Sequence, residues 1–301
     1  MSGRATVGLA LEWFVNVDHA PIVVALERGL FDERGLDVHV VEPVDHEAGM
    51  ALVAAGKLDL AITEPIHMPG ERLEGYPIVA IGKYFETGFG LLLKKGVGLG
   101  DLAGTTIAAP LGTYAPAMVQ AMAEYRGIAL ERDAVHYADV SYYLVDALRR
   151  NEAVGAFAAF ENVEVLEARA AGIEVELLRF LDHDVPSPGH LVFCAHEDAV
   201  DDPERRDVLE RFLGGVVAGV HAVREDPDGA LETFLHVAPH LRGELTQQQW
   251  ADTVGRFTDD LSLDPELWAR LARFVHERGL VEREVSVKEL LRPLGVTEQG
   301  G

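Results

Sequence analysis

The sequence has few basic residues for its size. Its 301 residues include 26 Lys and Arg against 50 Asp and Glu, a formal net charge of −24. Proteins that bind nucleic acid need an excess of Lys and Arg on one face, because neutralising phosphates supplies most of the affinity. Basic residues here cluster only in pairs such as Lys94 and Lys95. We therefore expect no nucleic-acid partner and no attraction to an anionic membrane surface.

The chain also has little cysteine and no long hydrophobic run. The single cysteine, Cys194, allows no intrachain disulfide and no thiolate metal cluster. No stretch approaches the ~18 apolar residues of a membrane span, so we expect no membrane insertion. Residues 1–6 show no basic segment followed by an apolar core, as an export signal would. The sequence as given predicts a cytoplasmic protein, or an extracytoplasmic one if an export signal has been removed.

What is present is an alternation of strand and helix patterns over the first 200 residues. The hydrophobic content of 48% and mean hydropathy of +0.07 are typical of a globular chain, and the length predicts one large or two medium domains. Strand, helix and strand in repetition predict parallel sheets covered by helices on both faces. Strands are expected at residues 6–13, 36–41, 58–63, 78–81, 105–109, 135–138, 153–160, 174–180 and 191–195, and helices at 21–34, 46–55, 115–126, around 144–148 and at 163–171.

Strand patterns disappear after residue 203, and a helical C-terminal segment follows. Proline stands in the first turn of three expected helices, where its missing N–H costs nothing. An aspartate precedes each of these prolines and is the expected N-cap: Asp202, Asp226 and Asp264. The expected helices are residues 203–224, 227–236, 246–258 and 265–278.

Several segments match one family in order and spacing over almost the whole chain. They resemble the thiamine-pyrimidine group of solute-binding proteins, whose members bind hydroxymethyl- or formylamino-pyrimidines. The matching segments are Leu11-Glu12-Trp13, Asn16, His19, residues 25–38, 56–61, 77–82, 162–165, 192–200 and 279–281.

The resemblance implies the α/β, two-lobed, type 2 periplasmic-binding-protein fold. It implies a first lobe of residues 1–91 and 192–301 and a second of 92–191, with a ligand bound in the cleft between them. A small-molecule ligand and an ABC transporter permease are the partners that this family leads us to expect.

Two segments carry the expected ligand contacts in the first lobe. Glu12 and Trp13 lie at the carboxyl end of the first expected strand, and open α/β sheets bind ligands at the carboxyl ends of their strands. An indole can stack on an aminopyrimidine, and a carboxylate can accept hydrogen bonds from its amine. The alternative is a core tryptophan beside a solvated glutamate. By the resemblance, Asn16, His19, Glu64 and His67 add polar contacts.

The second lobe supplies two further segments. Phe160 ends an expected strand, and Asn162 and Glu164 follow it. Glu164 is the carboxylate expected to read a ring nitrogen or amine; alternatively it is an ordinary acidic residue in a first helical turn. Gly112, Thr113 and Tyr114 lie between a strand and a helix, where free N–H groups favour an anion. A plain turn is an equal alternative there.

Residues 63–67 decide between two functions. A related family, the eukaryotic-type pyrimidine synthase, holds pyridoxal phosphate on a lysine of this segment and consumes a histidine four residues later. Here the histidine is kept as His67, but Thr63 stands in place of the lysine, and a hydroxyl cannot form an imine. The cysteine cluster of the synthase is also missing apart from Cys194. We therefore expect no cofactor.

Histidines could in principle bind a metal, but their spacing does not require one. His19, His67, His183 and His190 form no His-x-x-x-His pair, and we expect no metal site.

The sequence thus favours a non-catalytic protein that binds an aminopyrimidine-like or cationic heterocycle. Glu12, Glu64 and Glu164 are the carboxylates expected to face it. The alternatives are an intracellular enzyme of pyrimidine or thiamine-precursor synthesis, in which His67 would be the reacting residue, and a cytoplasmic ligand sensor.

Overall fold

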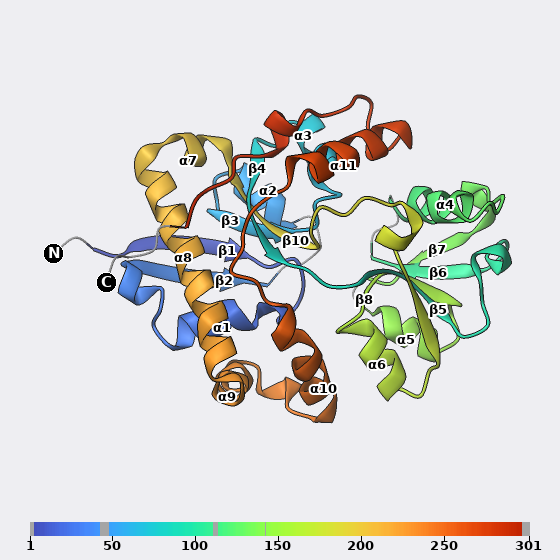
Figure 1. Cartoon of the computed structure of the whole chain (residues 1–301), viewed down its shortest axis with the longest axis horizontal. Helices are drawn as coiled ribbons and strands as arrows, with labels where there is room; N and C mark the ends of the chain where they lie inside the picture. The colour runs from blue at the N-terminus through green and yellow to red at the C-terminus, as the bar shows by residue number, and fades with distance from the viewer. Residues whose placement is uncertain (1–2, 43–47, 111–113, 142, 297–301) are drawn as a thin grey trace. The chain divides into compact units, whose positions relative to one another are not determined.

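The structure is a computed structural model that describes residues 3–42, 48–110, 114–141 and 143–296. The chain divides into two compact units (Figure 1). Unit 1 consists of Met1–Glu86, Pro188–Trp268 and Val285–Gly301, and unit 2 of Thr87–Ser187 and Ala269–Glu284. These units differ from the expected lobes mainly in residues 269–284, which belong to unit 2.

Unit 1 is built on a five-stranded sheet with the order β2-β1-β3-β10-β4. β1 pairs in parallel with β2 and β3, whereas β10 is antiparallel to both β3 and β4. Aromatic rings fill the core beside β10: Phe193 contacts Tyr84 and Phe212, with ring centroids 5.0 and 5.6 Å away. The strands are β1 Ala5–Ala10, β2 Leu36–Val41, β3 Leu60–Thr63, β4 Ile78–Phe85 and β10 Leu191–His196.

Unit 2 repeats this arrangement with the order β7-β6-β8-β5-β9. β6 is parallel to β7 and β8, and β5 is antiparallel to both β8 and β9. The strands are β5 Phe89–Lys94, β6 Thr106–Ala109, β7 His136–Asp139, β8 Gly155–Phe160 and β9 Val175–Arg179.

The expectation of wholly parallel sheets is wrong, because each sheet contains one antiparallel strand. In both sheets this strand is the first that the chain forms after crossing from the other unit: β5 follows β4 of unit 1, and β10 follows β9 of unit 2. By contrast, the parallel neighbours β1 and β2, and likewise β6 and β7, are joined through a helix within their own unit, as parallel neighbours require.

β5 is absent from the expected strands, and its glycine explains why. A Cβ on Gly90 would lie 2.1 Å from the carbonyl oxygen of Leu178 on β9. The close approach of the two strands therefore requires glycine at this position, although glycine is unfavourable within strands. The same residue weakens the strand pattern in the sequence.

The helices cover the sheets, and the three expected N-caps are confirmed. Asp202, Asp226 and Asp264 each accept a hydrogen bond from a backbone N–H in the first turn of the following helix. Asp202 and Asp226 cap helices of unit 1. The helices of this unit are α1 Ala20–Glu27, α2 Ala48–Ala54, α3 Met68–Leu73, α7 Glu197–Asp201, α8 Pro203–Glu225, α9 Pro227–Val237, α10 Glu244–Thr253 and α12 Val287–Leu290.

Unit 2 has helices of its own, and one further helix contains residues of both units. α4 Ala115–Tyr125, α5 Leu144–Arg149 and α6 Glu164–Ala170 belong to unit 2. α11 is Pro265–Glu277, and the division between the units follows Trp268. α5 and α6 pack their leucine, valine and alanine side chains against β8.

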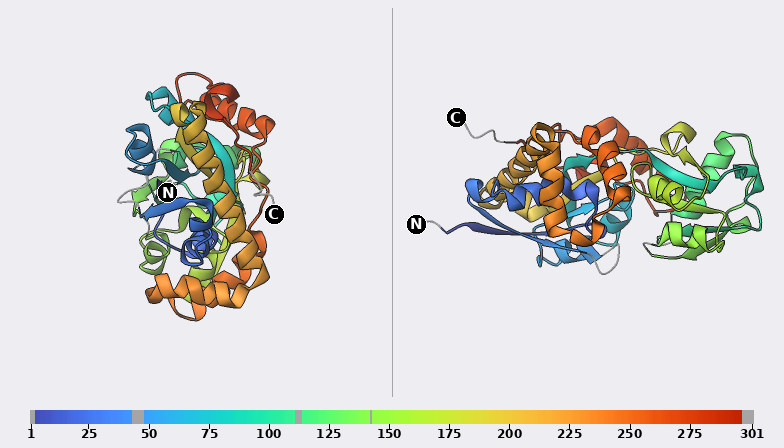
Figure 2. Two further views of the ribbon diagram at one scale, coloured as in Figure 1. Left: turned by 90° about the vertical axis from the view of Figure 1, so that its left-hand side faces the viewer. Right: turned by 90° about the horizontal axis from the view of Figure 1, so that it is seen from below.

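The longest helix, α8, packs on α1 in unit 1 (Figure 1 and Figure 2). The two backbones touch at Gly219, where a Cβ would lie 2.0 Å from the carbonyl oxygen of Pro21. This contact anchors α1, the helix that follows the loop of residues 11–19 at the carboxyl end of β1. Within the described ranges, no helix combines the length and apolar composition that a membrane crossing requires.

Candidate functional site

Glutamates follow three neighbouring strands of unit 1 at the point where each strand ends. β1 ends at Ala10, β2 at Val41 and β3 at Thr63, and within two residues come Glu12, Glu42 and Glu64. The carboxyl ends of parallel strands meet at one edge of a sheet. This edge of unit 1 is therefore acidic. Glu42 is not among the predicted site residues, although the same strand-then-glutamate pattern could have identified it.

Two further titratable groups reach this edge because of strand direction. β10 runs against its neighbours, so that His190, directly before it, lies where β3 and β4 end. Tyr84 lies near the end of β4. Burial lowers the pKa of His190 to about 4, although Glu64 and Glu12 act in the opposite direction. Burial, with Glu12 and Asp18, raises the pKa of Tyr84 well above its ordinary value.

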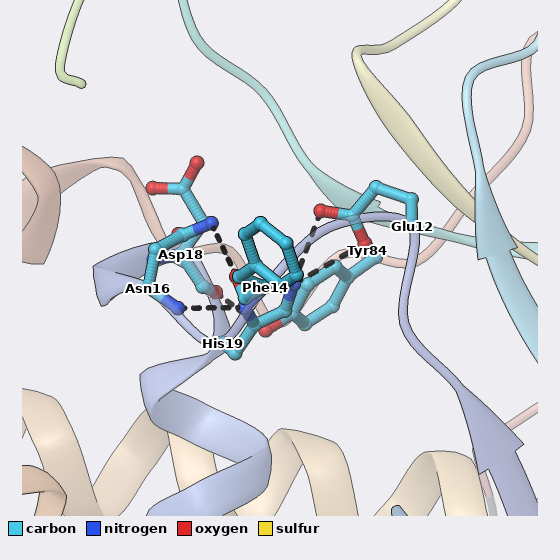
Figure 3. Close-up of polar contacts among 6 residues, drawn as sticks. All are labelled: Glu12, Phe14, Asn16, Asp18, His19 and Tyr84. Carbon is cyan, nitrogen blue, oxygen red and sulfur yellow. Dashed lines mark hydrogen bonds and ion pairs between the residues drawn. The ribbon is translucent and has the colours of Figure 1, made fainter. Parts of the chain in front are cut away.

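Glu12 and His19 form a buried pair (Figure 3). The two carboxylate oxygens of Glu12 lie 3.0 and 3.2 Å from His19 Nε2, and the side chains are 1% and 0% exposed. The backbone N–H of Asn16 donates to His19 Nδ1 at 3.1 Å. Since Nδ1 accepts, Nε2 carries the proton of the neutral ring and donates it to Glu12.

Electrostatics strengthen this pair. Burial lowers the pKa of His19, but the charge and hydrogen bond of Glu12, helped by Asp18 and Glu42, raise it more, so that the pKa lies above its ordinary value. A second proton would have to sit on Nδ1, where it would face the N–H of Asn16. The imidazole thus gains a proton only by giving up that hydrogen bond.

The loop between the paired residues carries the aromatic side chains. Residues 11–16 form no helix or strand. Trp13 is half-buried, and Phe14 is 41% exposed. Phe14 is not among the predicted site residues, because a single exposed aromatic residue in a loop carries no pattern. Asn16, predicted as a ligand contact, uses its side chain to accept from the N–H of Asp18 and to donate to the carbonyl of Phe14.

Glu64 and His67 lie after β3. Glu64 Oε2 is 3.7 Å from His67 Nε2, and the side chains are 8% and 14% exposed. The hydroxyl of buried Thr63 donates to the carbonyl oxygen of Glu64 at 3.4 Å. The position that would carry a lysine in the related synthase thus holds a hydroxyl that bonds to the backbone.

In unit 2 the predicted residues gather in the turn after β8. Glu164 Oε2 accepts from the backbone N–H of Phe160 at 2.8 Å, and Asn162 Oδ1 accepts from the hydroxyl of Thr87 at 2.8 Å. The Phe160 ring lies edge-on to Phe89. Tyr114 is the residue before α4, whereas Gly112 and Thr113 lie outside the described residues.

The backbone just before this turn is strained. Ala158 has a φ of 62°, a left-handed conformation that is uncommon outside glycine, and the pairing of β5 with β8 shifts register beside it. Such outliers cluster at functional sites, and a β-bulge re-aims the residues that follow it.

Each unit thus brings its own predicted residues together at one edge. Among the described residues, no three His, Cys, Asp or Glu side chains are placed to hold a metal ion. A polar depression of about 540 Å³ in unit 1 lies near Thr6, Leu58 and His196, at the opposite edge of the sheet.

Comparison with known proteins identifies the family. The family model described as NMT1/THI5 like matches residues 16–230. The chain belongs to this family. It is 26% identical over 296 residues to the formylaminopyrimidine-binding protein of Halalkalibacterium halodurans, covering 94% of this chain and 88% of that one. It is 24% identical over 294 residues to the 4-amino-5-hydroxymethyl-2-methylpyrimidine phosphate synthase of Legionella pneumophila, covering 95% and 90%.

Solved structures confirm the predicted two-lobed, type 2 periplasmic-binding-protein fold. The alkanesulfonate-binding protein of Xanthomonas axonopodis pv. citri superposes with a TM-score of 0.74 at 13% identity, covering 97% of this chain and 100% of that one. A ligand-binding component of an ABC-type import system from Staphylococcus aureus gives 0.73 at 15% identity, covering 96% and 97%.

Proposed function

We propose that this NMT1/THI5-like protein is a solute-binding protein for a small aminopyrimidine-like ligand of the thiamine-precursor kind. The observation that carries the proposal is the acidic edge of unit 1, where Glu12, Glu42 and Glu64 follow successive strands. The relative named for formylaminopyrimidine binding supports this ligand class.

The chemistry of the edge favours a ligand rich in N–H groups. Carboxylates accept hydrogen bonds and attract cations, and the charged groups that shift the pKa values of His19, Tyr84 and His190 are all carboxylates. A planar aminopyrimidine offers N–H donors to carboxylates of this edge such as Glu64 and a ring face to Trp13 and Phe14. A protonated or amidine-like heterocycle fits the same chemistry.

We propose ligand contacts from both units. In unit 1 these are Trp13, Glu64 and His67; in unit 2 they are the turn after β8, with Asn162 and Glu164, and the segment 112–114. The indole supplies stacking, and the carboxylates and amide read the amine and ring nitrogens. We propose that the two lobes close on the ligand by a hinge motion.

We also propose that an ABC transporter permease receives the ligand. A solved structure of the same fold is the ligand-binding component of an ABC-type import system. This likeness supports the proposed transporter partner, and with it we propose a location outside the cytoplasm. Fractionation of cells that express the natural gene distinguishes this location from the cytoplasm.

Calorimetric titration with a panel of aminopyrimidines tests the binding function. We expect Trp13→Ala to weaken binding about tenfold or more, because stacking is lost, and Trp13→Phe to retain part of the affinity. We expect Glu164→Gln to weaken it about tenfold, since a charged acceptor is lost. Glu174→Gln, at a 72% exposed position of unit 2, is the matched control. Absence of binding by the wild type, or unchanged binding by both site variants, would reject the proposal.

A synthase-like enzyme is the second candidate, favoured by the Legionella relative and by His67 beside Glu64. Covalent pyridoxal phosphate does not fit, because Thr63 offers a backbone-bonded hydroxyl in place of an amine. Incubation with pyridoxal phosphate and iron, followed by intact-protein mass spectrometry, tests this candidate. An unchanged intact mass, which shows that His67 has not been consumed, rejects it.

A further inference from the structure

The buried Glu12–His19 pair leaves the imidazole without a free nitrogen. Nδ1 accepts from the backbone of Asn16, and Nε2 donates to both oxygens of Glu12. Neither side chain is more than 1% exposed. A ligand contact through His19 would require breaking one of these bonds inside a buried environment, where an unsatisfied polar group is costly.

We propose that His19 is a positioning residue that holds Glu12 and thereby fixes the loop that presents Trp13 and Phe14. The two residues are seven positions apart, and the aromatic pair lies between them. Their hydrogen bond therefore joins the two ends of the loop, and we call the Glu12–His19 pair the clasp. That the fixed aromatic side chains contact a ligand rests on the proposed function, whereas the clasp itself does not.

The Glu12–His19 bond adds to other hydrogen bonds that hold this loop, among them the bond from the Asn16 side chain to the carbonyl of Phe14. At the start, the N–H of Leu11 donates to the carbonyl of Val41. At the far end, the Tyr84 hydroxyl donates to the carbonyl of Asp18 at 2.5 Å. Between them, residues 11–16 belong to no helix or strand, and ordering such a segment costs conformational entropy. A bond between residues 12 and 19 restricts the segment that contains both rings.

Tryptophan fluorescence measures the clasp directly. The chain has three tryptophans; Trp250 and Trp268 are 5% and 0% exposed, and Trp13 is half-buried. Acrylamide should therefore quench Trp13 preferentially, and Trp13→Phe identifies its share of the signal. Because the measurement is made on ligand-free protein, it remains valid if no pyrimidine binds.

Substitutions at both ends of the clasp give the test. We expect His19→Leu to increase quenching of Trp13 about twofold and to weaken aminopyrimidine binding about tenfold or more, because a hydrogen bond to a charged group is lost. His19→Gln, whose amide can still donate to Glu12, should restore most of both properties. Glu12→Leu should act like His19→Leu, and the double variant should act no more strongly than either single one. His39→Leu, at a 62% exposed histidine of unit 1, is the control.

Two results would overturn the proposal. The first is unchanged Trp13 quenching in folded His19→Leu together with lost binding, which would make His19 a direct ligand contact. The second is a His19→Gln variant that binds aminopyrimidine tenfold more weakly than wild type while its Trp13 fluorescence is quenched as in wild type. This result can be obtained even if the leucine variants do not fold. If wild type binds no pyrimidine but the quenching changes follow the expected pattern, the clasp stands and only the proposed function fails.

Discussion

The two units share a strand order but differ in the chemistry at the edge where the expected ligand contacts lie. In each sheet the fourth strand in order is antiparallel to its neighbours. In unit 1 this edge carries carboxylates and imidazoles, with Glu12, Glu64 and His190 acting on one another. In unit 2 the corresponding turn carries aromatic rings, an amide and one carboxylate, Glu164, that accepts a hydrogen bond from the backbone N–H of Phe160.

This difference shows that the topology specifies where side chains gather, whereas the loops after the strands specify what they do. The carboxylates of unit 1 suit N–H groups and positive charge, and we propose that they recognise them. Unit 2 is equipped for packing and for fixed hydrogen bonds. The stability of unit 1 should therefore depend on pH more strongly than that of unit 2.

The largest effect on stability is expected at acidic pH, from the resistance of buried His190 to protonation. Its folded pKa of about 4 lies below the ordinary 6.5. Below pH 6.5 the unfolded chain therefore takes up a proton that the folded chain does not, and stability falls until about pH 4. His190 therefore does not change the free energy of unfolding above pH 6.5, and it lowers this free energy by about 3 kcal/mol at pH 4.

His190→Gln, which does not titrate, should remove this dependence. Urea unfolding at pH 7 and pH 4.5 measures it: relative to wild type, the variant should gain stability as the pH falls. His39→Gln, at an exposed position, is the control and should follow wild type. Parallel pH profiles for wild type and His190→Gln would contradict the expectation.

A smaller effect is expected from the hydroxyl of Tyr84. It donates to the carbonyl of Asp18 in a buried environment, and Tyr84→Phe should lower the free energy of unfolding by about 1–2 kcal/mol. Tyr137→Phe in unit 2, where the ring is partly buried, is the matched control and should cost less. Equal losses in chemical denaturation would remove this distinction between the units.

The smallest effect is expected from the aromatic cluster of unit 2. Phe89 lies edge-on to Phe160 and Phe180, with ring centroids 5.6 and 4.8 Å away. Phe89→Leu should cost about 1 kcal/mol, because the aromatic pairing is lost. Since no titratable group takes part in these ring contacts, unfolding at pH 7 and pH 4.5 should show the same loss. A loss of unfolding free energy that changes with pH would contradict the expected difference between the two edges.

Much of the local structure could be predicted from the sequence, because it depends on neighbouring residues. The aspartates before three prolines predicted helix starts, and their side chains do accept the first-turn N–H groups. Helix 115–126 was predicted almost to its ends. β5 was missed because Gly90, which the contact with Leu178 requires, weakens the local strand pattern.

The candidate site was predicted as a set of residues but not as a set of contacts. Glu12 and His19 were both expected to face a ligand, and the structure directs them toward each other. Glu164 was expected to read the ligand, and one of its oxygens accepts from Phe160. Such pairings join loop residues at irregular spacing, so no periodic pattern reveals them.

The sequence by itself determined the family, the alternation of strands and helices, and the acidic residues at strand ends, since these follow from order, spacing and residue type. Only the tertiary structure decided that β5 and β10 run antiparallel, that Glu12 and His19 are buried together, and that His190 is held neutral. These properties depend on distances between segments far apart in the chain and on exclusion of water from them. Strand direction, hydrogen-bond partners and pKa values are therefore set by the folded chain as a whole.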